Sequence, residues 1–249
     1  MAAPAPEPCE LLPWDSKFFG LTIARVTHHQ LTRELCDEID RWCAERQVRC
    51  LYFLARADDD ATVCRAEKFG YHLVDVRMTL ERVAGTGDKS PDKHSDLRAA
   101  TSHDVTRLKQ IARASHTDTR FFFDANFDRG KAADLYETWI EASCDRFADK
   151  VFVVQRGGDV AGYVTCRLAL NRQEGSIGLI AVDAAHQGQG IGRELVQAAL
   201  DWFEEQKVDR TTVVTQGRNL AAQRLYARCG FITRKFELYY HRWFPTAAE

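Results

Sequence analysis

An apolar run that breaks into a glycine-rich turn and then into an amphipathic helix is the feature that most constrains the fold of this chain. The run covers residues 178–182, glycines stand at positions 188, 190 and 192, and a helical stripe of apolar residues begins at Ile191. Glycine allows positive φ and close approach of a ligand to the backbone. Free N–H groups at a helix start, backed by the positive end of the helix dipole, bind anions. The order strand, loop, helix therefore predicts an α/β unit with an anion site, and the expected anion is a pyrophosphate.

The spacing of the glycines distinguishes this loop from two other phosphate-binding loops. A dinucleotide fold needs G-x-G-x-x-G, but Arg193 stands where its third glycine would fall. A mononucleotide P-loop ends in G-K-[ST], which this loop lacks. The pattern that remains is Q-x-x-G-x-G, formed by Gln187, Gly190 and Gly192. It resembles the acyl-CoA signature of the GNAT superfamily of N-acetyltransferases; the alternative is a glycine-rich turn with no ligand.

A second motif, N-x-x-A-x-x-L-Y-x-x-x-G-F, covers residues 219–231. Asn219 is expected to cap a helix at its N-terminus and Gly230 to end it. The motif resembles the second GNAT signature, in which the Asn contacts the pantetheine side of CoA and the Tyr lies beside the thioester sulfur. The resemblance therefore implies that Tyr226 donates the proton that the leaving thiolate needs. The alternative interpretation of Tyr226 is a half-buried aromatic residue on an amphipathic helix.

The donor site is assigned residue by residue from this resemblance. Acetyl-CoA is the expected co-substrate, and backbone N–H groups of Ala181 or Val182, where GNAT strands separate, would hold the thioester carbonyl. Direct attack by an amine needs no metal, and none is expected. The residues expected to bind the co-substrate are Ile180, Ala181, Val182, Gln187, Gly188, Gln189, Gly190, Ile191, Gly192, Arg193 and Asn219.

The general base is less constrained by the sequence. Asp75 is the first candidate, because it stands mid-strand beside apolar residues and burial would raise its pKa toward that of a useful base. His116, Asp118 and Glu174 are further candidates by position, and each also has an ordinary surface or hydrogen-bonding interpretation. A water chain to bulk solvent is an equal alternative.

The N-terminal part of the chain resembles the C-terminal part when it is shifted by 160 positions. Trp42 then aligns with Trp202, and Gly70 with Gly230. Opposite the glycine-rich loop, residues 27–32 contain no glycine, so only the C-terminal copy is expected to bind CoA.

The expected fold class is α/β, with a GNAT-type mixed sheet flanked by helices, preceded by a smaller degenerate GNAT-like α/β half. A Gly/Pro/Ser-rich segment separates the two. In the second half, helices are expected at 103–115, 131–147 and 219–228, strands at 176–182 and 210–216, and a hairpin turn at 157–158. The expected segments are a disordered tail (1–9), a degenerate N-terminal α/β domain (10–83), a linker (84–95) and a catalytic GNAT domain (96–245).

Two aromatic segments are candidates for the acceptor side. Residues 14–20 carry W-D-x-x-F-F-G, and residues 120–123 carry R-F-F-F ahead of an L-Y-x-x-W-I helix. These motifs resemble those of GNAT enzymes that acetylate the amino group of a dTDP-linked sugar, which implies a nucleotide-linked amino sugar as acceptor. A forked guanidinium suits phosphate, and flat rings suit a base or sugar; an apolar plug under a loop is the alternative. The expected acceptor contacts are Phe18, Phe19, Arg120, Phe121 and Phe122.

Composition limits the other partners. The chain is 45% hydrophobic and 28% charged with a net charge of −2, and its acidic and basic residues are interleaved, so nucleic acid and membrane surfaces are not expected partners. It shows no membrane-spanning run and no secretion signal, and the expected location is the cytoplasm. The expected assembly is a monomer or a homodimer. Two alternative functions stay open: a GNAT acting on a peptide or another small-molecule amine, and a catalytically silent acyl-CoA-binding module.

Overall fold

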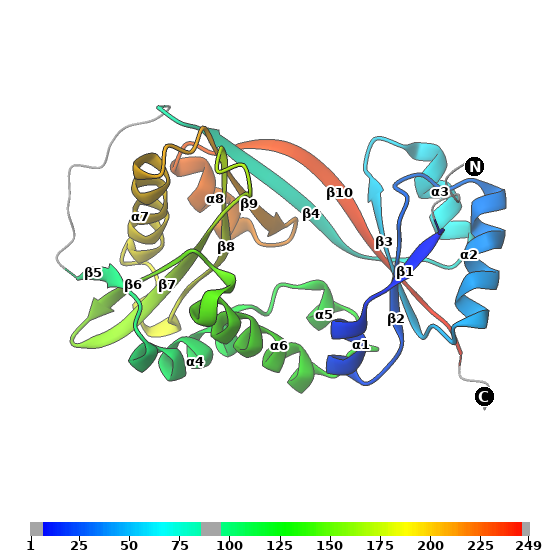
Figure 1. Cartoon of the computed structure of the whole chain (residues 1–249), viewed down its shortest axis with the longest axis horizontal. Coiled ribbons are helices and arrows are strands. Elements are labelled where there is room, and N and C mark those ends of the chain that lie inside the picture. Colours follow the sequence, from blue (N-terminus) through cyan, green and yellow to red (C-terminus); the bar gives the residue numbers. More distant parts are fainter. Residues whose placement is uncertain (1–6, 86–95, 246–249) are drawn as a thin grey trace. The chain divides into compact units, whose positions relative to one another are not determined.

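The computed structural model describes residues 7–85 and 96–245, and its contacts divide the chain into two compact units. Unit 1 comprises residues 1–77 and 236–249, and unit 2 comprises residues 78–235. The predicted α/β class, with a mixed sheet flanked by helices, is confirmed (Figure 1). Residues 1–6 of the expected tail and 86–95 of the expected linker lie outside the described residues, and a strand already begins at Cys9.

Unit 1 is a small sheet packed against two helices. Its strand order is β1-β2-β3-β10, with β2 and β3 parallel and the other two pairs antiparallel. Apolar residues at helical spacing on α2 and α3, such as Ile39 and Ala66, are fully buried in its core. The elements are β1 (Cys9–Leu11), α1 (Pro13–Phe19), β2 (Ile23–Val26), α2 (Arg33–Glu45), β3 (Cys50–Arg56), α3 (Asp60–Lys68), β4 (His72–Val83) and β10 (Ile232–Trp243).

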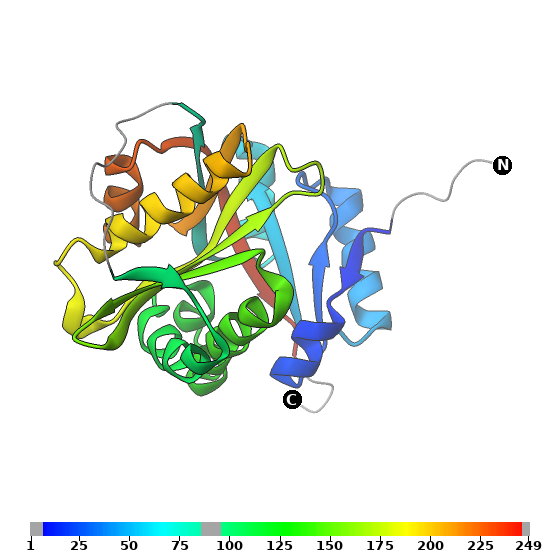
Figure 2. The same cartoon turned by 60° about the vertical axis from the view of Figure 1, so that its left-hand side comes forward.

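Unit 2 holds the larger sheet, in the strand order β4-β9-β8-β7-β6-β5. Helices α7 and α8 cover one face of this sheet, and α4 and α6 cover the other (Figures 1 and 2). The elements are β5 (Leu97–Ala99), α4 (Val105–Ser115), α5 (Arg120–Phe123), α6 (Arg129–Ala142), β6 (Lys150–Arg156), β7 (Asp159–Leu168), β8 (Glu174–Val182), α7 (Ile191–Glu205), β9 (Arg210–Gln216) and α8 (Leu220–Arg228). Short 3-10 turns cover Ser102–Asp104 and Ala184–His186, and a π-helical turn covers Ser143–Phe147.

The internal repeat is present at the level of secondary structure. When shifted by 160 positions, the bounds of β3, α3 and β4 coincide with those of β9, α8 and β10, and α2 falls within α7. The glycines that follow the second helix of each copy, Gly70 and Gly230, have φ of 76° and 82°. The two halves of the sequence therefore follow the same local plan.

Each unit is completed by a strand from the other half of the sequence. Strand β4 ends the first copy, but it neighbours β9 in unit 2, where the Ala84 N–H donates to the Asp209 carbonyl at 2.9 Å. Strand β10 ends the second copy, but its residues 237–243 pair with residues 50–56 of β3 in unit 1. The contacts accordingly divide the chain within β4 and within β10.

The N-terminal half of α7 lies unusually close to the sheet. A Cβ at Gly162 on β7 would stand 3.2 Å from Ile191 and 3.1 Å from Leu195, so only a glycine leaves room for these helix residues. A Cβ at Gly192 would stand 3.2 Å from Leu225 of α8. These close contacts fix the start of α7 at the end of β8. None of the helices within the described residues is long and apolar enough to cross a membrane.

Candidate functional site

Strands β8 and β9 pair for only part of their length. Their parallel register runs from Glu174 and Arg210 to Ile177 and Val213. Strand β8 continues to Val182 and β9 continues to Gln216, so the two strands separate over their last residues. We call this separation, between residues 178–182 and 214–216, the β8–β9 wedge. The strand separation predicted from the GNAT resemblance is therefore present.

The backbone of β8 directs two N–H groups into the wedge. The N–H of Leu179 donates to Thr165 Oγ1 at 2.7 Å, and that of Asp183 donates to the Ala161 carbonyl at 2.8 Å, both toward β7. Because N–H directions alternate along a strand, Ala181 also faces β7, and Ile180 and Val182 face the wedge. The sequence left Ala181 and Val182 as equal candidates for holding a carbonyl oxygen, and the geometry favours Val182 together with Ile180.

A bulge on β8 lies at the start of the wedge. Val164 pairs with Ile180 and Cys166 pairs with Ile177, so two residues of β8, Gly178 and Leu179, stand opposite Thr165 alone on β7. Its buried side chain receives the Leu179 N–H, and a Cβ at Gly178 would stand only 2.8 Å from the Thr165 hydroxyl. Thr165 and Gly178 thus form a matched pair that bends β8 away from β9. Thr165 was not predicted as part of the site, because nothing in the local pattern of β7 or β8 marks this bulge.

The glycine-rich loop presents a row of backbone donors. Gly188 and Gly190 have φ of 77° and 83°, and a Cβ on either would meet open space. Gly190 is the N-cap of α7 and its carbonyl receives the N–H of Arg193 at 2.9 Å. Among the described residues, no acceptor receives the N–H groups of residues 188–192. A diphosphate fits this exposed row of donors at the positive end of a long helix.

Gln187 contributes to the loop in a different way from the expected ligand contact. Its side-chain amide donates to the Val182 carbonyl at 3.3 Å, which ties the loop back to the end of β8. Arg193 is exposed on the first turn of α7, where its guanidinium can reach an anion on the loop. Gln189 is also exposed. Ile191 is buried under α7, so its share in an anion site is its backbone N–H alone.

Tyr226 and Asn219 lie on α8, as the second motif predicts. The Asn219 side chain caps α8 by accepting the Ala222 N–H at 2.9 Å. Tyr226 is only 2% exposed and belongs to the same apolar cluster as Ile180 and Val182. Burial raises the pKa of its phenol above the ordinary value, so it keeps its proton at neutral pH. The alternative interpretation, a half-buried aromatic residue, underestimated its burial.

His116 is the base candidate that lies in unit 2 beside the sheet. Its Nε2 is 3.0 Å from the Tyr163 hydroxyl, and its ring stacks on Tyr136 with centroids 4.7 Å apart. Tyr163 is the register partner of Ala181, so this group lies on the α4 and α6 face of the sheet beside the wedge. Burial lowers the pKa of His116 to about 4, so the ring is neutral at neutral pH.

The other base candidates occupy different places. Asp75 is 6% exposed, as its apolar neighbours predict, and its Oδ1 accepts the Val76 N–H at 2.9 Å. It belongs to unit 1, together with Phe18 and Phe19. Glu174 begins β8, whereas the wedge lies at the other end of that strand, and it faces Arg210 at 3.7 Å.

We call residues 116–127 the acceptor loop, because acceptor contacts are predicted there. Its aromatic residues differ in exposure. Phe121 is 2% exposed and packs edge-on against Phe127 at 5.2 Å, with the Arg120 guanidinium 4.1 Å from its ring. Phe121 is therefore a core residue beneath the loop, which corrects its expected role as a contact. Phe122 is half-buried and Phe123 is 59% exposed. In unit 1, Phe19 is likewise buried, and Phe18 stacks on exposed Trp14 with centroids 5.2 Å apart.

A cleft of about 340 Å³ opens beside this loop in unit 2. Sequence analysis identified Phe122 from its lining and named Asp118 as a base candidate, but it missed the two arginines. Their signal was weak because they are far apart in the sequence, and one of them precedes the N-cap of the second motif. The lining residues are Thr117, Asp118, Phe122, Phe123, Arg129 and Arg218.

Comparison with known proteins agrees with the loop, the wedge and the second motif. The family model of the Acetyltransferase (GNAT) family matches residues 107–231, which include all three. The chain therefore belongs to the GNAT acetyltransferase family. A GCN5-related N-acetyltransferase from Sphaerobacter thermophilus has the same fold, with a TM-score of 0.68 and 15% identity over 94% of this chain and 76% of that one.

Two curated relatives have names linked to sugars. The chain is 28% identical to the dTDP-fucosamine acetyltransferase of Escherichia coli O6:H1 over 231 residues, which cover 89% of this chain and 92% of the relative. This match confirms the likeness that the aromatic motifs indicated. The chain is 31% identical over 157 residues, 63% of its length, to the spore coat polysaccharide biosynthesis protein SpsD of Bacillus subtilis, and it spans about half (53%) of that relative.

Proposed function

We propose that this protein transfers an acetyl group from acetyl-CoA to a primary amine by direct attack, and that the acceptor is a nucleotide-linked amino sugar of the dTDP type. The observation that carries the proposal is the β8–β9 wedge, which opens directly into the unsatisfied donors of residues 188–192. A strand gap with inward N–H groups and an anion-binding loop at its end match an acyl group joined to a diphosphate. When bound, acetyl-CoA supplies an acetyl group activated as a thioester.

Backbone N–H groups and two side chains bind acetyl-CoA in this proposal. The N–H groups of residues 188–192, with Arg193 beside them, bind the diphosphate. Asn219 lies at the mouth of the wedge and contacts the pantetheine. The N–H groups of Ile180 and Val182 donate to the carbonyl oxygen as negative charge develops on it, which lowers the barrier to attack. Removing one such donor in other enzymes costs about 10²–10³ in kcat.

Proton transfers require an acid and a base. Tyr226 donates a hydrogen bond to the leaving sulfur, and its raised pKa keeps the phenol protonated until that moment. The attacking amine must lose its proton to a base. Asp75 remains the first candidate by its burial, and His116 is the second because its neutral ring contacts Tyr163, the register partner of Ala181.

The acceptor class is supported by the names of the relatives and by the charges of the cleft. The two sugar-related relatives favour a nucleotide-linked sugar over a peptide amine. The cleft beside the acceptor loop holds one carboxylate and two guanidiniums, which disfavours a polycationic acceptor such as an aminoglycoside. A GNAT acting on a peptide or another small amine, and a catalytically silent acyl-CoA-binding module, are the alternatives.

An amine panel tests the proposal. The protein is incubated with acetyl-CoA and dTDP-linked amino sugars, peptides with free α-amines, lysine peptides or aminoglycosides, and free CoA is measured with a thiol reagent. Turnover with a dTDP-linked amino sugar well above the other amines supports the proposal. Turnover only with peptides would show that the acceptor is a peptide amine rather than an amino sugar. CoA binding without turnover of any amine would indicate the catalytically silent module.

A further inference from the structure

We infer that the cleft lined by Arg218, Arg129, Phe123, Phe122, Thr117 and Asp118 binds the nucleoside diphosphate part of the acceptor. This inference rests on the proposed function and assigns a part of its substrate to particular residues. It keeps Phe122 from the predicted acceptor contacts, whereas Arg120 and Phe121 do not line the cleft. The volume of about 340 Å³ lies in the range of roughly 300–1,000 Å³ that is usual for ligand pockets.

Arg218 and Phe123 form the wall best suited to a nucleotide. The Arg218 guanidinium lies 4.0 Å from the centroid of the Phe123 ring, and that ring is 59% exposed. Stacking on a ring uses one face of the guanidinium, and the N–H donors of the group lie in its plane. Such a fork donates two parallel hydrogen bonds to a phosphate. The exposed ring of Phe123 and the adjacent ring of Phe122 offer faces on which a base can stack.

Arg129 adds a second cation from a different element. It is the first residue of α6, a helix whose N-terminal turn is capped by Asp128, which accepts the Lys131 N–H at 2.8 Å. The positive end of this helix therefore lies at the cleft together with the Arg129 guanidinium. Two guanidiniums from separate elements suit a diphosphate, which carries two or more negative charges.

The remaining polar groups limit the ligand further. Asp118 is the one carboxylate of the lining and leaves the cleft with an excess of positive charge. A carboxylate accepts hydrogen bonds from a ribose hydroxyl or from the N–H of a pyrimidine base, and the Thr117 hydroxyl can donate or accept. The lining thus combines phosphate donors, stacking faces and acceptors for a nucleoside.

The position of the cleft connects it to the wedge. Arg218 stands two residues after the end of β9 and directly before Asn219, the N-cap of α8. Strand β9 forms one side of the wedge, so a ligand held by Arg218 lies at the mouth where the acetyl group is expected. The sugar amine can then point into the wedge while the diphosphate stays in the cleft.

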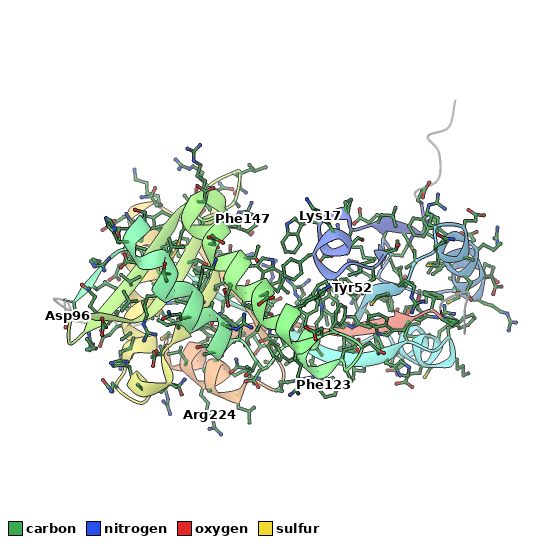
Figure 3. The ribbon with its side chains drawn as sticks, turned by 90° about the horizontal axis from the view of Figure 1, so that it is seen from below. Lys17, Tyr52, Asp96, Phe123, Phe147 and Arg224 are labelled. Atoms are coloured by element: carbon green, nitrogen blue, oxygen red, sulfur yellow. The ribbon has the colours of Figure 1, made fainter. Side chains whose placement is uncertain are left out.

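Binding of dTDP to the whole protein tests the inference without depending on catalysis. Calorimetric titration of dTDP is compared for the wild type, Arg129→Gln and Arg218→Gln, with Arg224→Gln as the matched control. Arg224 is an exposed arginine of α8 that extends outward and does not line the cleft, whereas Phe123 lies at the end of α5 (Figure 3). Each cleft variant is expected to weaken dTDP binding by about tenfold or more, the value for loss of a charged hydrogen bond. Arg224→Gln is expected to bind as the wild type does.

A further variant tests the aromatic wall of the cleft. Phe123→Leu removes the stacking ring and keeps both arginines, so it should weaken the binding of dTDP more than that of inorganic diphosphate. Thermal unfolding of every variant shows whether the fold is retained. Wild-type affinity for dTDP in folded Arg129→Gln and Arg218→Gln proteins would overturn the inference, as would no binding of dTDP by a wild type that binds acetyl-CoA and acetylates amines.

The phosphate on the ribose of CoA is a second phosphate group that the arginines of this cleft could bind. Titrations with CoA and with 3′-dephospho-CoA show whether the cleft binds this phosphate of CoA or the diphosphate of the acceptor. If the cleft binds the acceptor, Arg218→Gln should leave the ratio of the affinities for CoA and 3′-dephospho-CoA unchanged. A ratio that falls toward one in this variant would assign the cleft to the donor, and the acceptor inference would fail while acetyl transfer stands.

Discussion

Gly190→Ala is the sharpest test of the donor site, because the structure supplies a matched control. Gly190 has φ of 83° and Gly158, in the β6–β7 turn, has φ of 91°, and a Cβ on either would meet nothing within 4 Å. The cost of alanine in the free protein is therefore backbone strain alone, about 1–2 kcal/mol at each position. The two variants should lose similar stability, which for a chain of this size lowers Tm by about 2–4 °C per kcal/mol.

The two variants should differ in their affinity for acetyl-CoA. At Gly190 the added methyl group occupies the open space beside the donors of residues 188–192, where the diphosphate is expected. Loss of one charged hydrogen bond costs about 1.5–3 kcal/mol, so Kd should rise by about tenfold or more. Gly158 lies in a turn outside the loop, and Gly158→Ala should bind acetyl-CoA as the wild type does.

Calorimetric titration with acetyl-CoA and urea unfolding of the same preparations provide the two measurements. Unchanged acetyl-CoA affinity in a folded Gly190→Ala protein would refute the argument that these amides bind the diphosphate. An equal loss of affinity in Gly158→Ala would show that backbone strain alone weakens acetyl-CoA binding. The affinity would then give no evidence for binding at the loop.

Three further outcomes follow from the site. Tyr226→Phe should lower kcat by about 10² or more, as loss of a proton donor does, with little change in acetyl-CoA affinity; an unchanged kcat in steady-state assays would exclude the phenol from the mechanism. Thr165→Val leaves the Leu179 N–H without its acceptor and should cost about 1–3 kcal/mol in urea unfolding, and no loss would show that the bulge does not need the hydroxyl. The lowered pKa of His116 means that the unfolded chain binds the proton more tightly, so stability is present above pH 6.5 and is lost as pH falls toward 4. Between pH 7 and 5 the loss should be up to about 2 kcal/mol and should disappear in His116→Phe; an equal loss in both proteins would show that the pKa of His116 is not lowered in the folded state.

The sequence predicts those elements in which local pattern and packing agree. The bounds of β9 were expected at 210–216 and are found there, because an alternating apolar strand is bounded by a turn on both sides. The turn at Gly157 and Gly158 joins β6 and β7 as expected. By contrast, no helix was predicted at residues 13–19, because the aromatic residues there show no helical periodicity. Helix α1 forms there all the same, and it buries Phe19.

The candidate site likewise has one part that the sequence predicts and one part that it does not. The loop from Gln187 to Gly192 is local in sequence, and its positive φ values and its place before a helix follow from its glycines. The cleft beside the acceptor loop combines Arg129 with Arg218, which are distant in the sequence and meet only through tertiary packing. Phe121 and Phe123 are identical in type and two positions apart, yet one is buried and the other exposed. Only the packing of α5 decides which ring is available.

Comparison of the repeated helices supports the expectation that only the second copy binds CoA. In the first copy, the Thr32 hydroxyl caps α2 by accepting the Leu35 N–H at 3.1 Å, so the helix satisfies a donor of its own first turn. In the second copy, the cap is Gly190, which has no side chain, and the donors at the start of α7 stay available. Ala66, fully buried, stands at the position that Tyr226 holds in the second copy. The first copy thus satisfies within its own fold the groups that the second leaves for a ligand, and its sheet is completed by β10 as a scaffold rather than as a second site.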